Sequence, residues 1–218
     1  MRSIFIGMPN MGEVRVELIP LLASWLCNPS LKIEIFAPSY KSPITFAHNL
    51  IVEEFLKGSC EWLFLLNADV VPPRNAIQCV ETEFDVVGLP APIYRDGVVT
   101  WTAFRRSGDA WRPVVQSEIE GRKWVEVDAI GGGCLIVRRK VFEKLDKPFF
   151  RFVYDEKGFV EVGEDFDFCR RVKEAGFRLG VYVGDVCSHW HKVDLNRCPT
   201  FLDRLKAKGI SPLTVRLQ

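Results

Sequence analysis

The feature of the sequence that most constrains the fold is an alternation of short apolar runs with segments of helical spacing. The run Trp62–Leu66 (WLFLL) contains no polar residue, which is typical of a strand covered on both faces. Further strands are predicted at Ser3–Met8, Lys32–Ala37 and Asp85–Leu89, and helices at Glu13–Leu26 and Thr45–Leu56. Pro20 interrupts the first of these helices and leaves a kink or a late helix start open. Strands that alternate with helices predict an α/β domain with a mostly parallel sheet flanked by helices.

The sequence changes character between Tyr94 and Ala129, where short alternating segments are separated by polar turns. This stretch predicts a small antiparallel insertion or extended loops. The strand and helix pattern then resumes, with a strand at Cys134–Val137, a helix at Glu164–Ala175 and a last strand at Leu179–Val183.

Length and charge exclude some classes of protein. A chain of 218 residues suits one large domain. The formal net charge is +1, from 29 Lys and Arg against 28 Asp and Glu, so the sequence gives no sign of the basic face that nucleic-acid polymers require. No apolar run approaches the roughly 20 residues of a membrane span. With no signal peptide before the first strand and seven scattered cysteines, we expect a reduced, cytoplasmic setting.

Two polar residues, Asn67 and Asp69, directly follow the apolar strand Trp62–Leu66. Ligands of open α/β sheets bind at the carboxyl ends of parallel strands, where these side chains would lie. Their oxygens suit Mg²⁺ or Mn²⁺ bridging phosphates. The same pattern also fits an Asx turn that ends a strand.

An acidic pair, Glu164 and Asp165, opens the helix predicted at Glu164–Ala175. The helix dipole favours carboxylates in a first turn and keeps them ionised, as a general base requires. Plain helix capping is the alternative explanation.

A run of three glycines, Gly131, Gly132 and Gly133, precedes the predicted strand Cys134–Val137. Glycines allow the backbone to approach a ligand closely, although a flexible turn explains the run as well. The sequence contains neither the dinucleotide-binding fingerprint nor a P-loop at this position.

Two of the three histidines, His189 and His191, lie beyond the last predicted strand. Imidazole suits Mn²⁺ as well as Zn²⁺. A zinc site made of Cys187, His189, His191 and Cys198 is an alternative, but its C-x-H-x-H-x₆-C spacing lacks the short paired spacings of structural zinc modules.

In this order, the motifs resemble those of GT-A glycosyltransferases, over roughly Ile4 to His191. The shared pattern is an apolar strand ending in a DXD-like turn, a glycine-rich loop, an E-D pair opening a helix, and a late histidine. The run Val162–Gly176 (VGEDFDFCRRVKEAG) looks especially like the E-D helix of family-2-type enzymes. The stretch Asn49–Asp69 resembles small archaeal and phage members.

The resemblance implies a role for each matching residue. Asp69 would ligate the metal on the nucleotide diphosphate, Asn67 would take the first position of the DXD motif, and His189 would complete the metal or diphosphate site. Asp165 would be the catalytic base and Glu164 its acidic neighbour. The loop Gly131, Gly132, Gly133 would face the donor sugar and acceptor, and Pro9 and Asn10 would contact the nucleoside.

One departure from the family concerns the first motif position, which holds Asn67 instead of Asp. The family often ligates the metal chiefly through the last Asp, so this change weakens the resemblance without removing it. A second metal contact would then be indirect, or metal affinity would be low.

The fold class implied is a GT-A, Rossmann-like α/β domain over residues 1–218. Within it we expect a nucleotide-binding half at about 1–90, an acceptor and catalytic half at 91–192, and a C-terminal tail at 193–218. The implied reaction is a Mn²⁺- or Mg²⁺-dependent transfer of a sugar from a nucleoside-diphosphate sugar to a hydroxyl of a sugar, lipid or protein acceptor. A single displacement with Asp165 as base inverts the anomeric configuration, although a retaining outcome stays open.

Two other functions stay open. A nucleotidyltransferase would share the metal site but should carry a basic glycine-rich loop, and Gly7–Gly12 contains no Lys or Arg. A non-catalytic sugar- or nucleotide-binding protein of the same fold is favoured by Asn67 in the DXD position.

Overall fold

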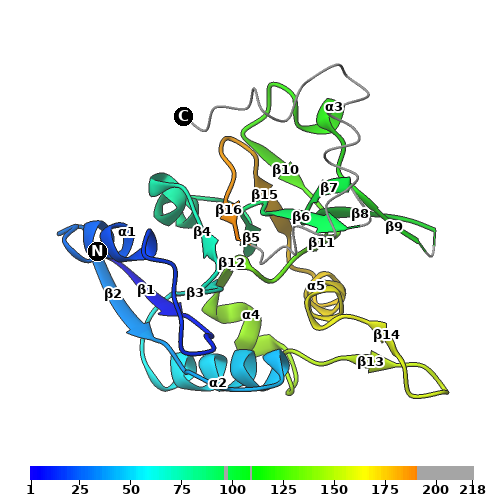
Figure 1. Cartoon of the computed structure of the whole chain (residues 1–218), viewed down its shortest axis with the longest axis horizontal. Coiled ribbons are helices and arrows are strands. Elements are labelled where there is room, and N and C mark those ends of the chain that lie inside the picture. The colour runs from blue at the N-terminus through cyan, green and yellow to red at the C-terminus, as the bar shows by residue number, and fades with distance from the viewer. Residues whose placement is uncertain (96–97, 109, 191–218) are drawn as a thin grey trace, which may run out of the picture.

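The centre of the molecule is a seven-stranded sheet with the strand order β10-β15-β5-β12-β3-β1-β2 (Figure 1). The structure is a computed structural model that describes residues 1–95, 98–108 and 110–190. The strands of the sheet are β1 (Arg2–Gly7), β2 (Leu31–Phe36), β3 (Trp62–Leu66), β5 (Val86–Gly88), β10 (Trp124–Glu126), β12 (Cys134–Arg138) and β15 (Leu179–Tyr182). The β1–β2, β1–β3 and β5–β15 pairs are parallel, whereas β12 and β10 run antiparallel to their neighbours. The predicted α/β fold with a mostly parallel sheet is confirmed.

The strand β3 is buried along its whole length, as its apolar sequence predicted. Leu63 and Leu65 belong to one hydrophobic core and Phe64 to another, because alternate side chains of a strand point to opposite faces of the sheet. Ile51 of one helix and Leu18 of another lie in these two separate cores, so the sheet is covered on both faces.

The helices are α1 (Leu18–Leu26), α2 (Ile44–Lys57), α3 (Gln116–Ile119), α4 (Arg139–Lys144), α5 (Glu164–Glu174) and the 3₁₀ helix η1 (Arg74–Val80). The first helix, predicted within Glu13–Leu26, starts late, at Leu18, which is one of the two outcomes that Pro20 left open. Pro20 occupies the first turn of α1, where its missing N–H costs no helical hydrogen bond. The residues before Leu18 instead run along the end of β3, where the Arg15 N–H donates to the Ala68 carbonyl at 3.0 Å.

The segment between β5 and β12 contains the predicted antiparallel insertion. It consists of the hairpin of β6 (Pro92–Arg95) and β7 (Val98–Trp101), and of a three-stranded sheet of β8 (Ala103–Ser107), β9 (Ala110–Pro113) and β11 (Ala129–Ile130). Two short pairs were not predicted: β13 (Val153–Tyr154) with β14 (Val160–Val162), and β4 (Val70–Val71) with β16 (Ser188–His189). None of the helices in the described part of the chain has the length and apolar character needed to cross a bilayer.

Candidate active site

The glycine loop lies beside the end of β3 because β12 runs antiparallel to that strand. Cys134, the first residue of β12, pairs with Leu66, the last residue of β3. The Asn67 N–H then donates to the Gly133 carbonyl at 2.9 Å. Two predicted motifs that are far apart in the sequence, Asn67–Asp69 and Gly131–Gly133, are therefore in contact.

The side chains of Asp69 and His189 face each other across the β4–β16 pair, with 3.6 Å between Asp69 Oδ2 and His189 Nε2. His189 Nδ1 lies 2.8 Å from the Pro92 carbonyl oxygen, which can only accept a hydrogen bond. Nδ1 therefore carries a proton, and in the neutral ring the lone pair of Nε2 is directed toward Asp69. The hydrogen bond to Asp69 raises the pKa of His189, although partial burial opposes this shift.

A carboxylate oxygen and an imidazole nitrogen that face one another fit a divalent cation such as Mn²⁺. In the described ranges, no group of three or more His, Cys, Asp or Glu side chains could hold a metal ion. Asp69 and His189 by themselves offer a cation two ligands, and a cation held there would need oxygen ligands from another source, such as a bound phosphate. For the zinc alternative, His191 and Cys198 lie outside the described residues.

A pocket of about 680 Å³ opens beside this pair, within the size range of small-molecule sites. Its lining includes four of the residues predicted to bind the donor: Pro9, Asn10, Asn67 and Asp69. The predicted glycine loop, His189 and Asp165 are not among its lining residues. Two cationic side chains that the motifs did not indicate, Arg15 and Lys41, line it as well. Their positive charge suits a diphosphate.

Two segments at the rim of the pocket are hydrogen-bonded to successive backbone carbonyl groups of the turn that follows β3. Arg15 N–H donates to Ala68 O at 3.0 Å, and Trp190 N–H donates to Asp69 O at 3.1 Å. The Arg15 guanidinium lies over the Trp190 ring, 4.0 Å from its centroid, in a cation–π contact. The β1–α1 loop and the segment after β16 thus meet at the pocket.

Asn10 contributes to the pocket through a loop that its own side chain stabilises. Its Nδ2 donates to Met8 O at 3.2 Å, and its Oδ1 accepts from Gly12 N at 3.0 Å. The amide that was predicted to contact a nucleoside therefore holds the loop in place.

Asp165 lies at the start of α5, against the glycine loop. Its Oδ2 accepts from Gly132 N at 3.3 Å and its Oδ1 from Phe166 N at 2.9 Å. Burial raises the pKa of Asp165, and these two backbone hydrogen bonds oppose that shift. Burial also raises the pKa of Glu164, with a further contribution from the charge of Asp165. Residues 132 and 133 thus connect the predicted base to the predicted metal-site turn.

The sequence analysis missed His48, a residue of α2 that lies under the same loop. Its ring is 1% exposed, and its centroid is 4.9 Å from that of Phe150. Burial lowers the pKa of His48 to about 4, and the neighbouring Asn67 side chain opposes this only in part. The sequence held a signal, because His48 falls at helical spacing with the buried Ile51 and Val52.

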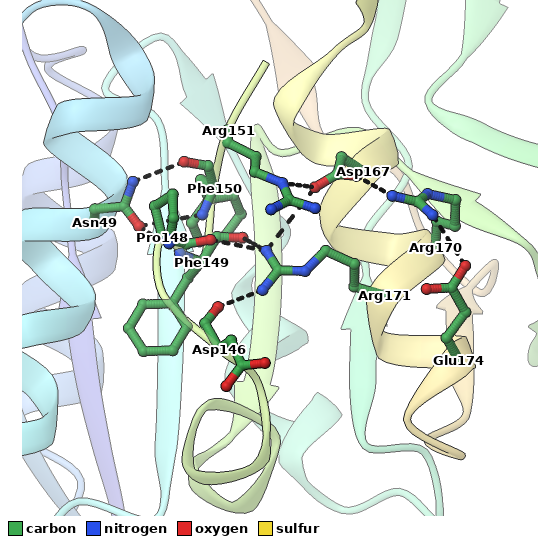
Figure 2. Close-up of polar contacts among 10 residues, drawn as sticks. All are labelled: Asn49, Asp146, Pro148, Phe149, Phe150, Arg151, Asp167, Arg170, Arg171 and Glu174. Carbon is green, nitrogen blue, oxygen red and sulfur yellow. Dashed lines mark hydrogen bonds and ion pairs between the residues drawn. The ribbon is translucent and has the colours of Figure 1, made fainter. Parts of the chain in front are cut away.

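A buried polar cluster holds α5 against the segment 146–151 (Figure 2). Asp167 is 0% exposed and accepts from Arg151 Nε at 2.9 Å and from Arg170 Nη2 at 2.5 Å. Arg171 donates to the carbonyls of Pro148 and Phe149 at 2.8 and 3.1 Å, and also to that of Asp146.

From the opposite side, Asn49 of α2 holds the same segment, as Figure 2 shows. Its Oδ1 accepts from the N–H groups of Phe149 and Phe150 at 2.8 and 3.1 Å, and its Nδ2 donates to Phe150 O at 2.7 Å. The segment 146–151 is thus fixed between α2, which carries His48, and α5, which carries Asp165.

No protein-family model and no curated protein sequence matches the chain. Among solved structures, the fold is similar to that of the viral protein A197 from STIV, with a TM-score of 0.61 and 24% identity over 89% of this chain and 87% of that chain. It is also similar to GalNAc-T7, a structure that holds UDP, GalNAc and Mn²⁺, with a TM-score of 0.53 and 13% identity over 89% of this chain and 44% of that chain.

A third match is S. aureus TarS 1-349 in complex with UDP-GlcNAc, with a TM-score of 0.46 and 11% identity over 89% of this chain and 60% of that chain. At such low identities the likeness concerns the fold alone. This chain spans less than half of the GalNAc-T7 chain that it matches. The chain has the GT-A fold that GalNAc-T7 also has, as the order of its sequence motifs predicted.

Proposed function

We propose that the chain is a metal-dependent glycosyltransferase that moves a sugar from a nucleoside-diphosphate sugar to an acceptor hydroxyl. The observation that carries the proposal is the pair of hydrogen bonds on either side of the glycine loop. One joins Gly132 to Asp165, and the other joins Gly133 to Asn67. A fixed carboxylate and a metal-site turn that contact the same glycine loop are the two parts that transfer of this kind needs.

In this proposal the donor diphosphate lies in the pocket of about 680 Å³. Asp69 and His189 hold Mn²⁺ or Mg²⁺, which when bound stabilises the negative charge of the departing nucleoside diphosphate. Arg15 and Lys41 add positive charge around the same phosphates. The presence of UDP, GalNAc and Mn²⁺ in the GalNAc-T7 structure supports this choice of ligands.

Asp165 takes the proton of the acceptor hydroxyl as that hydroxyl attacks the anomeric carbon. Two backbone N–H groups fix the orientation of its carboxylate, and burial raises its pKa, which makes it a stronger base than an exposed aspartate. Because a single attack by an external hydroxyl displaces the nucleoside diphosphate, the anomeric configuration inverts. The acceptor is a sugar, a lipid or a protein.

The test is the variant Asp69→Ala, compared with Glu143→Ala, which removes an exposed carboxylate of α4. We expect Asp69→Ala to weaken Mn²⁺-dependent binding of a nucleoside diphosphate by about tenfold or more, equivalent to about 1.4 kcal/mol. Glu143→Ala should bind normally. Calorimetry with and without Mn²⁺ measures both affinities, and an unchanged affinity in folded Asp69→Ala would remove this residue from the site.

The same preparation separates the proposed function from the two alternatives. A glycosyltransferase releases free nucleoside diphosphate from a nucleotide sugar when acceptor or water is present. A nucleotidyltransferase instead releases pyrophosphate from a nucleoside triphosphate, and a binding protein releases neither product.

A further inference from the structure

Two neighbouring side chains at the candidate site, of the buried His48 and the partly buried Asn67, have buried polar atoms without a well-formed hydrogen bond. Within the described ranges, neither ring nitrogen of His48 nor Asn67 Oδ1 has a partner of acceptable length and angle, although the two side chains are close enough for Asn67 to raise the pKa of His48. The His48 ring is 1% exposed, so solvent does not satisfy it from the surface. Because unpaired buried polar atoms destabilise a fold, native proteins keep few of them, and each one needs an explanation.

Gly132, which has no side chain of its own, lies beside these groups. A methyl group on Gly132 would lie 3.6 Å from Asp165 Cβ and 3.7 Å from His48 Cε1, both ordinary contact distances. Cε1 is the ring carbon between the two unpaired nitrogens of His48. The space beside Gly132 is therefore bounded by the base on one side and by the imidazole edge on the other.

We propose that His48 and Asn67 form a subsite for a single hydroxyl oxygen beside Gly132. A neutral imidazole offers one donor and one acceptor, and Asn67 Oδ1 offers an acceptor, so a group that both donates and accepts satisfies them. A hydroxyl does so, whereas an apolar group leaves the unpaired atoms unchanged. An anion there would also be repelled by the Asp165 carboxylate.

The subsite would bind a hydroxyl of the donor sugar, and in this form the inference rests on the proposed function. A hydroxyl held between Asp165 and Asn67 would orient the sugar between the base and the metal-site turn. It would also favour sugars that carry a hydroxyl at that position, since analogues without it leave buried polar groups unpaired. An ordered water has the same hydrogen-bonding chemistry and is the other possible source of the oxygen.

Two variants change the subsite in different ways. His48→Phe keeps a ring beside Phe150 but removes both nitrogens. Gly132→Ala fills the space, and its contacts at 3.6 and 3.7 Å leave the surrounding atoms in place. His48→Gln, which retains a donor and an acceptor, serves as the conservative variant.

Two properties are measured. Thermal unfolding gives the stability of the free protein. Calorimetry in the presence of Mn²⁺ gives the affinities for UDP and UDP-GlcNAc, or for the nucleotide and nucleotide sugar that the wild type binds best. We expect both His48→Phe and Gly132→Ala to fold and to lose about tenfold or more in affinity for the nucleotide sugar. Their affinity for the nucleotide alone should be unchanged, His48→Phe should be at least as stable as the wild type, and His48→Gln should recover part of the loss.

A lower melting temperature of the free protein in both variants, with equal losses for both ligands, would assign the subsite to an ordered water. Unchanged melting temperature together with unchanged affinity for both ligands would overturn the proposal. If the wild type binds no nucleotide sugar, that result counts against the proposed function. Thermal unfolding needs no donor, so it would still test whether the subsite holds an ordered water. If His48→Phe does not fold, the same measurements on Gly132→Ala alone distinguish these outcomes.

Discussion

The half-buried carboxylate of Asp165 is oriented by backbone hydrogen bonds to both of its oxygens. Each of its two oxygens accepts one backbone N–H, from Gly132 and from Phe166. Asp167, two residues further along α5, is fully buried and paired with arginines, so it cannot reach a substrate. Among the acidic residues in the first turn of α5, this leaves Asp165 and Glu164 as candidate bases.

We expect Asp165→Asn to lower the transfer rate by roughly 10² to 10⁴, because the amide keeps the shape of the side chain but takes no proton. Donor affinity should stay nearly unchanged, since this carboxylate acts on the acceptor. Steady-state kinetics and donor calorimetry measure the two effects. A mutant with normal turnover would move the role of base to Glu164.

The same carboxylate predicts the acid side of the pH profile. Burial raises the pKa of Asp165, and the base works only when ionised. Activity should therefore be present above that raised pKa and be lost as the pH falls through it. In Asp165→Asn the residual rate should lack this acid-side loss, and a profile of unchanged shape would contradict the assignment.

At the scale of single residues, the sequence could indicate Asp69 and Asp165 because each follows or opens a recognisable element. It could not indicate the role of His48. A histidine on the apolar face of a helix is usually part of a core, and only the packed structure shows that Gly132 passes beside it. The sequence also could not predict that the Asn10 side chain hydrogen-bonds within its own loop, because these bonds depend on the conformation of residues 8–12.

At the scale of elements, α5 and α2 are connected through the irregular segment 146–151. Arg171 pairs carbonyl groups of this segment, and Asn49 pairs N–H groups that no strand or helix satisfies. A buried ion-pair cluster is weak evidence for stability, yet breaking one is costly when buried groups lose their partners. The cluster therefore holds the two helices of the site at a fixed separation.

We expect Arg171→Met to destabilise the protein by at least about 2 kcal/mol, because it leaves several carbonyls of the segment unpaired. Arg2→Met is the control, because it removes an arginine from an ion pair at the surface. The Arg2 and Glu81 side chains are 43% and 65% exposed, and surface ion pairs contribute roughly 0–1 kcal/mol. Urea unfolding measures both variants, and equal losses would show that Arg171 has no special structural role.

Most of the elements could be predicted, because their apolar spacing is long enough to be distinctive. The direction of β12 could not, because it follows an antiparallel insertion instead of a crossover helix. The pairs β4–β16 and β13–β14 are too short to show a periodicity, although β4–β16 brings His189 to Asp69. The geometry of the site thus depends on contacts between segments that carry little local signal.

At the scale of the whole molecule, the metal content distinguishes a substrate-linked cation from a structural zinc cluster. In the proposed function, Asp69 and His189 form a two-residue site that needs phosphate oxygens, so the purified protein should carry no stoichiometric zinc. His189→Ala should weaken Mn²⁺-dependent nucleotide binding and leave the stability of the free protein nearly unchanged. Cys187→Ala should have little effect on either property.

Elemental analysis and thermal unfolding provide the measurements. In a structural zinc cluster, metal binding is part of the folding free energy, so loss of a ligand would destabilise the protein by several kcal/mol. One zinc per chain, with a large loss of stability in both variants, would replace the proposed catalytic cation by a zinc cluster.

The strand order of the sheet also sets the order in which a chain leaving the ribosome can fold. Strands β1, β2 and β3 all precede Asn67 and can pair as soon as they have emerged. In contrast, β5 lies between β12 and β15, so one of its edges can pair with β12 but the other waits for residues as late as Leu179–Tyr182. Because α5 leads directly into β15, the helix that carries Asp165 is fixed in the same late step. A nascent chain would therefore acquire its donor-side strands first and its proposed base last. The edge of β3 stays open until β12 has emerged and one edge of β5 until β15 has emerged, so these are the edges that a chaperone would need to shield.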